Sequence, residues 1–191
     1  MPGRYANQVS VLSVLFGFSC AFAFAGRHFL AGSLLLFVSA ILDLVDGNVA
    51  RKNHTESRFG GAVFDWIADK YVDAAVILGV GFSGIPIISH LIEVPPVADF
   101  GVVGGLALAG SLLNTFIKPV TYAEIGYSER VAGKIEDPLE GGVGFFGRPE
   151  TILVLVLGGV TGLLWVSVLL IAICTNLSAA QRVFYLYRRY S

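Results

Sequence analysis

The stretch "FLAGSLLLFVSAILDLVDGNVAR" (Phe29–Arg51) begins with fourteen uncharged residues and then carries two aspartates, a glycine and an arginine. Similar uncharged runs recur along the chain, because 22 residues separate Arg4 from Arg27 and 31 separate Glu150 from Arg182. A helix that crosses a membrane needs roughly 20 apolar residues. The stretch therefore predicts a membrane helix with a group of charged residues at its end.

The composition supports this class of protein. The 191 residues are 55% hydrophobic and 14% charged, with a mean hydropathy of +0.74, whereas soluble domains carry about 25% charged residues. We expect an all-α integral membrane protein made of one domain, residues 1–191. The formal net charge of -1 gives no sign of nucleic-acid binding, and we expect no such partner. Cys20 and Cys174 lie in apolar runs and are interpreted as buried small residues.

The N-terminus resembles a secretory signal, since Arg4 precedes an apolar run that ends in "AFAFAG". We interpret the run as a first spanning helix instead, because it is long enough to cross a membrane and the remaining helices need it.

Six transmembrane helices are expected in total. The last uncharged run would be ~46 Å long as one helix, too long for a hydrocarbon core of ~30 Å, so we divide it at a turn near Gly158, Gly159 and Gly162. The expected helices are Gln8–Gly26, Phe29–Asp46, Gly60–Phe82, Phe100–Tyr122, Phe145–Thr161 and Leu163–Tyr185.

The distribution of Lys and Arg predicts the orientation. Six spans place both termini on one side, and this side collects nearly all the basic residues of the loops and termini, whereas the other side has Arg27 alone. Because cytoplasmic loops are enriched in Lys and Arg, we expect a multi-pass protein of the cell membrane with both termini in the cytoplasm. The residues on the predicted cytoplasmic side are Arg4, Arg51, Lys52, Arg58, Arg130, Lys134, Arg148, Arg182, Arg188 and Arg189.

Five aspartates gather at the cytoplasmic ends of the second and third helices. Asp43 and Asp46 are three residues apart, and Asp65, Asp69 and Asp73 are spaced by four, so each set shares one helix face. Antiparallel neighbours joined by a short loop would bring both faces to the same depth. Close carboxylates repel one another unless positive charge joins them, and hard oxygen ligands suit Mg²⁺ or Mn²⁺.

The spacing alone leaves two other interpretations open. Chains of aspartates also line proton or cation pathways, and these acids could simply pair with Lys70 and Arg51. A transporter needs its acids near the middle of the membrane with access from both sides. Here all five lie toward one end, which favours a two-metal site for displacement at phosphorus.

The residues Asp43–Asp69 resemble the signature of the CDP-alcohol phosphotransferases, D-x2-D-G-x2-A-R, about eight residues, then G-x3-D-x3-D. Asp43, Asp46, Gly47, Ala50 and Arg51 fit without a gap, and Gly61, Asp65 and Asp69 complete the pattern. Nine residues rather than eight separate Arg51 from Gly61, so either Gly60 or Gly61 fills the glycine position. The family's amphipathic helix before the first span is expected to be absent or short here.

The resemblance implies a fold, a site and a reaction. The fold would have six transmembrane helices, with a cytoplasmic active site between helices two and three. Asp69 would be the general base as well as a metal ligand, and an alcohol would attack the β-phosphorus of a CDP-alcohol with release of CMP. Two Mg²⁺ or Mn²⁺ ions would be held by Asp43, Asp46, Asp65 and Asp69, and the CDP group would be bound by Gly47, Ala50, Arg51, Ser57 and Gly61. The family usually forms homodimers.

The alcohol is indicated by weaker signals. Asp73, four residues beyond the signature, and "FGRPETILVLVLG" (Phe146–Gly158) are similar to the branch that accepts inositol phosphate, the phosphatidylinositol-phosphate and archaetidylinositol-phosphate synthases. A phosphorylated acceptor needs cations, and we expect Lys118, Arg148 and Arg182 to bind its phosphate. Basic side chains that only anchor the helices at the membrane surface are the alternative, and we read Arg188 and Arg189 in this way.

The leading expectation is transfer from a CDP-linked lipid, CDP-diacylglycerol or CDP-archaeol, to inositol phosphate in phospholipid biosynthesis. One alternative is the same chemistry with CDP-inositol as the donor, as in the synthase that makes di-inositol-phosphate phosphate. Another is glycerol phosphate as the acceptor. A cation or proton transporter is the alternative from another class. The sequence assigns no role to Asp73.

Overall fold

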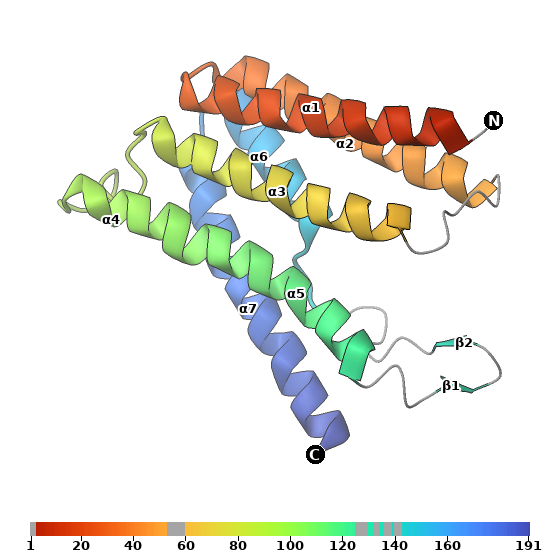
Figure 1. Cartoon of the computed structure of the whole chain (residues 1–191). Helices are drawn as coiled ribbons and strands as arrows, with labels where there is room; N and C mark the ends of the chain where they lie inside the picture. Colours follow the sequence, from red (N-terminus) through yellow and green to blue (C-terminus); the bar gives the residue numbers. More distant parts are fainter. Residues whose placement is uncertain (1–2, 53–59, 125–129, 132–133, 136–138, 140–142) are drawn as a thin grey trace.

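A computed structural model of the chain describes residues 3–52, 60–124, 130–131, 134–135, 139 and 143–191. Its helices form long rods that reverse direction from one to the next (Figure 1). The helices are α1 (Gly3–Ala25), α2 (Phe29–Lys52), α3 (Gly60–Phe82), α4 (Pro96–Gly101), η1 (Val102–Leu108), α5 (Ala109–Glu124), α6 (Arg148–Thr161) and α7 (Leu164–Tyr190). Together, α4, η1 and α5 make one of these rods. Two short strands, β1 (Arg130–Val131) and β2 (Lys134–Ile135), pair antiparallel after α5.

The expected helices are all present, and the departures from the prediction lie at their ends. The bounds of α3 are those predicted, whereas α2 continues to Lys52 and therefore includes the whole stretch Asp43–Arg51. Helix α6 begins at Arg148 rather than Phe145, and the β1–β2 ribbon was not predicted. The turn between α6 and α7 lies at Gly162, whose positive φ of 77° suits a glycine at a helix C-terminus.

The helix predicted as Phe100–Tyr122 is one continuous helical rod that is π-helical over part of its length. It consists of α4, the π-helix η1 and α5, and runs over Pro96–Glu124 (Figure 1). A π-helical segment inserts extra residues per turn and rotates the face of the helix that follows. The α5 portion packs mainly against α7.

Helix α1 packs against both α2 and α3, and α6 packs against α2 and α7. Serine pairs contribute to the α1–α2 contact, since Ser39 Oγ donates to the Ser13 carbonyl at 2.8 Å and Ser13 Oγ donates to the Ser39 carbonyl at 2.9 Å. Such bonds between helices are common in membrane proteins. α1 thus contacts both α2 and α3 and connects them (Figure 1).

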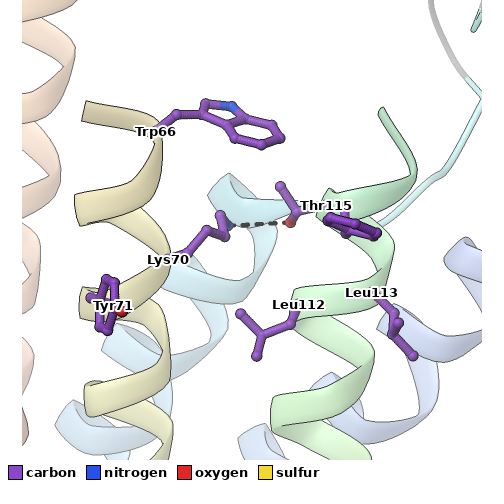
Figure 2. A pocket seen from close by; sticks show the side chains of 7 residues that line it. Trp66, Lys70, Tyr71, Leu112, Leu113 and Thr115 are labelled. Atoms are coloured by element: carbon purple, nitrogen blue, oxygen red, sulfur yellow. Dashed lines mark hydrogen bonds between the residues drawn. The ribbon is translucent and has the colours of Figure 1, made fainter. Parts of the chain in front are cut away.

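Helices α3 and α5 diverge enough to leave a pocket of about 570 Å³ between them (Figure 2). Its lining is mostly apolar, with one cation, Lys70, whose Nζ donates to Thr115 Oγ1 across the pocket at 3.2 Å. The lining residues are Trp66, Lys70, Tyr71, Leu112, Leu113, Thr115 and Phe116.

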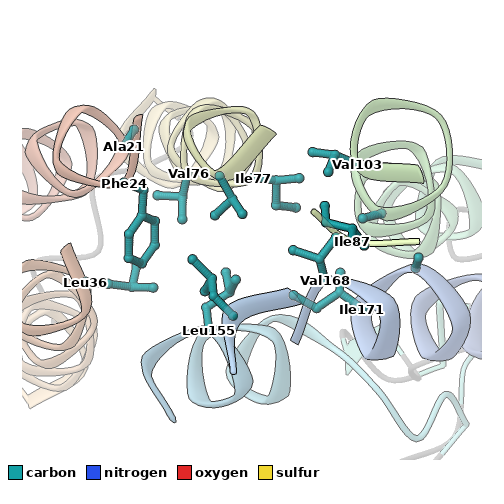
Figure 3. Close-up of a cluster of buried hydrophobic side chains, with 14 of the residues drawn as sticks. Ala21, Phe24, Leu36, Val76, Ile77, Ile87, Val103, Leu155, Val168 and Ile171 are labelled. Carbon is teal, nitrogen blue, oxygen red and sulfur yellow. The ribbon is translucent and has the colours of Figure 1, made fainter. Parts of the chain in front are cut away.

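The hydrophobic core lies where α1, α2, α3, η1, α6 and α7 meet (Figure 3). Phe24 of α1, Ile77 of α3 and Ile171 of α7 are fully or almost fully buried there. Cys20 is also buried, as predicted, whereas Cys174 is partly exposed. The core thus joins the N-terminal helices to the C-terminal pair.

Many large apolar side chains nevertheless face outward. Phe22, Phe116 and Phe184 are more than half exposed, and they lie on three different helices. Two rods, Pro96–Glu124 and Leu164–Tyr190, are long and apolar enough to cross a membrane within the described residues, and Val9–Ala25 and Phe29–Val45 are shorter apolar helices. Exposed apolar surface on this scale is expected of helices that contact lipid.

The contact between α1 and α3 predicts an effect on stability. A Cβ atom added at Gly79 would lie 2.4 Å from the Ala21 carbonyl oxygen, and because this is backbone the helices would have to separate. We expect Gly79→Ala to destabilise the fold by about 1–3 kcal/mol. The thermal unfolding midpoint of the purified protein in detergent measures this. Gly105→Ala is the matched control, since a Cβ added there would meet no atom within 4 Å beyond the neighbouring backbone of its own helix. An equal loss in both variants would contradict the prediction.

Candidate functional site

The guanidinium of Arg148 lies at the centre of the carboxylate cluster. Its Nη1 donates to Asp43 Oδ2 at 2.6 Å and lies 2.8 Å from Asp69 Oδ2, while its Nη2 donates to Asp69 Oδ1 at 2.8 Å. Its Nε donates to Asp73 Oδ1 at 3.2 Å. Asp43 of α2 and Asp69 and Asp73 of α3 therefore contact one side chain from α6, which joins these three of the five predicted acids.

Asp73 is the most buried of the three acids and is held by a second cation. The exposed fractions of the side chains are 38% for Asp43, 23% for Asp69 and 7% for Asp73. Lys70 Nζ donates to Asp73 Oδ2 at 2.7 Å, so both oxygens of Asp73 accept a charged donor. A carboxylate this buried needs such partners. Asp73 thus pairs with Lys70 through one oxygen and with Arg148 through the other.

The start of α6 places Arg148 at this point. Pro149 follows Arg148 in the first turn, where a missing N–H costs nothing. The Gly147 N–H donates to Glu150 Oε2 at 2.7 Å, and Thr151 Oγ1 donates to the Gly147 carbonyl at 2.9 Å. The sequence "GRPET" therefore begins a helix at Arg148 and directs this side chain toward α2 and α3.

The segment before α6 is held by α5 and α7. Asn114 Nδ2 donates to the Phe146 carbonyl at 2.6 Å, and the Phe146 N–H donates to Ser178 Oγ at 3.4 Å. Arg182 donates through Nη1 to the Asn114 carbonyl at 2.5 Å and through Nε to the Val143 carbonyl at 3.2 Å. Arg182 was predicted to bind an acceptor phosphate. In the structure it binds backbone carbonyls of α5 and of the segment that leads into α6.

These contacts predict that Arg182 supports the fold of this segment. Arg182→Gln removes a charged donor from two partly buried carbonyls, and we expect a loss of about 1–3 kcal/mol in stability. The unfolding midpoint in detergent measures the loss, and Arg188→Gln on the exposed end of the same helix is the control. If Arg182→Gln weakened only the use of a phosphorylated acceptor and left the midpoint unchanged, the structural role would be wrong.

Lys118, the third predicted phosphate ligand, is exposed near the end of α5. Its Nζ lies 5.8 Å from the centroid of the Tyr122 ring. The three predicted phosphate ligands therefore have different surroundings, since Arg148 contacts acids, Arg182 contacts carbonyls and Lys118 lies over an aromatic ring.

The side chains of several predicted site residues lie outside the described part of the structure. Residue Ser57 lies outside the described residues. The backbones of the others are helical, but their side chains are outside the described part of the chain; they are Asp46, Gly47, Ala50 and Arg51 in α2, and Gly61 and Asp65 in α3. Their predicted roles remain predictions.

The oxygens of Asp43 and Asp69 are chemically suited to a divalent cation. An oxygen of each reaches the same atom, Arg148 Nη1, so the two carboxylates converge on one positively charged point. Hard oxygen donors of this kind are the ligands that Mg²⁺ and Mn²⁺ prefer. The described side chains contain no group of three or more metal-binding residues; Asp43 and Asp69 are two of the four predicted ligands.

The sequence analysis missed two residues of α5 that form hydrogen bonds to other parts of the chain. Asn114 and Thr115 were not singled out, although each carries a polar group into an apolar helix, a signal that points to function or to a specific contact. Asn114 Oδ1 is buried without a partner among the described atoms. The link from Arg148 to Asp43 spans 105 residues, and local spacing does not encode such a contact.

Comparisons with known proteins find relatives that are similar over nearly the whole chain. Two archaetidylinositol phosphate synthases are similar over nearly the whole chain: that of Methanothermobacter thermautotrophicus is 23% identical, covering 96% of this chain and 84% of its own length. That of Pyrococcus horikoshii is 25% identical, covering 95% and 83%. A bifunctional IPC transferase and DIPP synthase of Rubrobacter xylanophilus is 31% identical over 95% of this chain, which spans 37% of that longer protein.

Solved structures share the fold. Phosphatidylinositol phosphate synthase of Mycobacterium tuberculosis with CDP-DAG bound has a TM-score of 0.72 at 22% identity, covering 98% of this chain and 94% of its own. The same enzyme in complex with manganese and citrate has a TM-score of 0.71 at 21% identity, covering 98% and 89%. A family model described as CDP-alcohol phosphatidyltransferase matches residues 4–127. The chain therefore belongs to the CDP-alcohol phosphatidyltransferase family and is a transferase of phosphate groups.

Proposed function

We propose that this chain transfers a phosphatidyl-type group from a CDP-linked lipid, CDP-diacylglycerol or CDP-archaeol, to a hydroxyl of inositol phosphate and releases CMP. The observation that carries the proposal is the convergence of Asp43 and Asp69, from the two halves of the signature, on one positive charge. The acceptor is supported by the likeness over almost the whole chain to two proteins named archaetidylinositol phosphate synthase.

The residues would divide the reaction between them. Asp69 accepts the proton of the acceptor hydroxyl, whose oxygen forms a bond to the β-phosphorus while the bond from this phosphorus to the oxygen of CMP breaks. A base must lie close to the hydroxyl and be aligned with it. The side chain of Asp69 extends from α3 into the site and is about three-quarters buried. Gly47, Ala50, Arg51, Ser57 and Gly61 would bind the CDP group.

Divalent cations are part of the proposal. Asp43, Asp46, Asp65 and Asp69 would hold two ions, Mg²⁺ or Mn²⁺, which supply positive charge that stabilises the phosphate oxygens and the leaving CMP. Lys118, Arg148 and Arg182 would attract the phosphate of the acceptor. Arg148 suits this role because the planar guanidinium pairs with two phosphate oxygens at once.

The proposed setting is a multi-pass protein of the cell membrane. We propose one domain over residues 1–191 with six spans, with both termini and the active site in the cytoplasm and a homodimer as the assembly. The Lys and Arg distribution supports the orientation.

The direct test is incubation of the purified chain with CDP-diacylglycerol or CDP-archaeol, labelled inositol phosphate and Mg²⁺. We expect CMP and a labelled lipid to appear together, and neither to appear in EDTA. No release of CMP from any CDP-alcohol would overturn the proposal.

CDP-inositol as the donor is the second candidate. The likeness of this chain to the protein named bifunctional IPC transferase and DIPP synthase favours it, with 31% identity over 95% of the chain. The same assay separates the two candidates, because release of CMP from CDP-inositol alone would transfer the assignment to the soluble donor.

Lys118 provides a test of the acceptor site. Loss of one charged contact to a phosphate costs about 1.5–3 kcal/mol, so we expect Lys118→Ala to raise the KM for inositol phosphate by about tenfold or more. The KM for the CDP donor should change much less. Steady-state kinetics with each substrate varied in turn measures the difference, and equal effects on both KM values would indicate that Lys118 only anchors the helix.

A further inference from the structure

The contacts of Arg148 divide into one with a buried acid and two with partly exposed acids. Its Nε donates to Asp73, whose side chain is 7% exposed, whereas its terminal nitrogens contact Asp43 and Asp69, which are 38% and 23% exposed. The same guanidinium therefore has one side against a buried acid and the other against the open acids of the site.

Asp73 is itself held in place by contacts that involve neither Asp43 nor Asp69. Lys70 Nζ donates both to Asp73 Oδ2 at 2.7 Å and to Thr115 Oγ1 at 3.2 Å, which ties Asp73 to α5 (Figure 2 shows the contact between Lys70 and Thr115). Asp73 thus keeps a partner on each oxygen. Because the guanidinium is planar and rigid, the terminal nitrogens can leave their partners with the Nε contact kept only if the group pivots about Nε.

The terminal nitrogens occupy the place that the proposed function gives to a cation. Asp43 Oδ2 and Asp69 Oδ2 both lie against Nη1, at 2.6 and 2.8 Å. A divalent cation that took the same oxygens as ligands would bring its charge against the guanidinium, and like charges at such separations repel by several kcal/mol in a partly buried site. Nη1 and the ion cannot both be held there.

From this geometry we propose that Asp73 is a positioning residue that holds Arg148 by Nε, and that the terminal nitrogens of Arg148 exchange between two partners. Without a divalent cation they pair with Asp43 and Asp69. When the cation binds these acids, the nitrogens are released while Nε stays on Asp73, and they then face the phosphate of the acceptor. The identity of that acceptor rests on the proposed function, whereas the exchange rests on the contacts of Arg148.

The exchange has a thermodynamic consequence. An acceptor phosphate that binds the released nitrogens and a cation that releases them must each strengthen the binding of the other, because coupling between two sites is reciprocal. The protein would thus favour the acceptor only after the site acids have been neutralised by metal.

Chemical labelling of the wild-type protein tests the release without any substitution. The full chain in detergent is treated with phenylglyoxal, an arginine reagent, in EDTA or in saturating Mn²⁺, and the labelled peptides are quantified by mass spectrometry. We expect labelling of Arg148 to rise several-fold with Mn²⁺, because a paired guanidinium reacts poorly. Arg188, exposed at the end of α7, is the internal reference and should not respond. Unchanged or reduced labelling of Arg148 in Mn²⁺ would overturn the exchange.

Metal affinity tests the competition. Arg148→Gln removes the competing charge, so we expect it to bind Mn²⁺ about tenfold more tightly than wild type, the effect of roughly one charged hydrogen bond. Arg188→Gln should bind Mn²⁺ as wild type does. Titration of free Mn²⁺ by electron paramagnetic resonance gives the affinities. Equal or weaker binding by Arg148→Gln would mean that Arg148 supports the metal ligands, and the exchange would be wrong.

Asp73 is tested by its effect on the two substrates. With Mn²⁺ saturating, Asp73→Asn should raise the KM for inositol phosphate by about tenfold, since the anchor loses its charge, while the KM for the CDP donor changes little and Asp73→Glu restores part of the loss. An equal loss for both substrates would overturn the positioning role.

The outcomes separate this inference from the proposed function. Release of CMP in the transfer assay, with no response of Arg148 labelling or of Mn²⁺ affinity, would leave the function standing and remove the exchange. The reverse result, a response of both with no release of CMP from any CDP-alcohol, would keep the exchange and remove the function.

Discussion

Replacement of Asp69 by asparagine is expected to lower kcat for CMP release by about 10²–10⁴-fold, the usual contribution of a positioned general base. Asparagine keeps the shape of the side chain but cannot accept the proton of the acceptor hydroxyl. Asp69 lies within 2.8 Å of two nitrogens of Arg148, and it contributes to the site from α3. The change therefore acts on chemistry more than on the arrangement of the helices.

The measurement is steady-state release of CMP with both substrates saturating, together with the unfolding midpoint in detergent. Asp43, Asp46 and Asp65 remain as proposed metal ligands in this variant, so we expect metal and donor binding to be largely retained. Glu93→Gln, the same chemical change at an exposed position in the connection between α3 and α4, is the matched control and should retain full activity. A rate near that of wild type in Asp69→Asn would show that another group is the base.

Replacement of Arg148 by alanine is expected to have the second large effect, and it should depend on metal. Removal of one partner from a buried ion pair costs about 3–5 kcal/mol, because the remaining charges are left unpaired. Arg148 and its partners are partly open to solvent, with exposed fractions of 21% for Arg148 and 38% for Asp43, so screening reduces the expected loss to about 1–3 kcal/mol. For a chain of this size, 1 kcal/mol lowers the unfolding midpoint by about 2–4 °C.

The midpoint is measured in EDTA and again in Mn²⁺. We expect the deficit of Arg148→Ala to be large in EDTA and to shrink in Mn²⁺, because the metal then neutralises Asp43 and Asp69 in place of the guanidinium. The KM for inositol phosphate should rise much more than that for the CDP donor. Arg188→Ala is the control for loss of a positive charge. The same deficit in both buffers would mean that Arg148 stabilises the fold independently of the metal ligands.

The amino-acid sequence by itself determined the helical class of the fold and the family of the chain. Its uncharged runs predicted the helices, and the bounds of α3 agree at both ends, because helix formation in an apolar chain depends on local length and composition. The spacing of Asp43 to Asp69 identified the family, since the signature lies within one pair of neighbouring helices. The ends of α2 and α6 were less well predicted because capping and tertiary contacts decide where a helix stops.

Only the tertiary structure decided which groups Arg148 and Arg182 contact. The sequence placed Arg148 and Arg182 together as phosphate ligands, whereas the fold puts Arg148 among the acids of α2 and α3 and Arg182 on the carbonyls that lead to it. The local sequence marks Arg148 as the start of a helix and leaves Arg182 inside one, but it does not name the partners of either. Their partners are set by how α6 packs against α2 and how α7 packs against α5, and such contacts depend on the assembled core rather than on the spacing of residues along the chain.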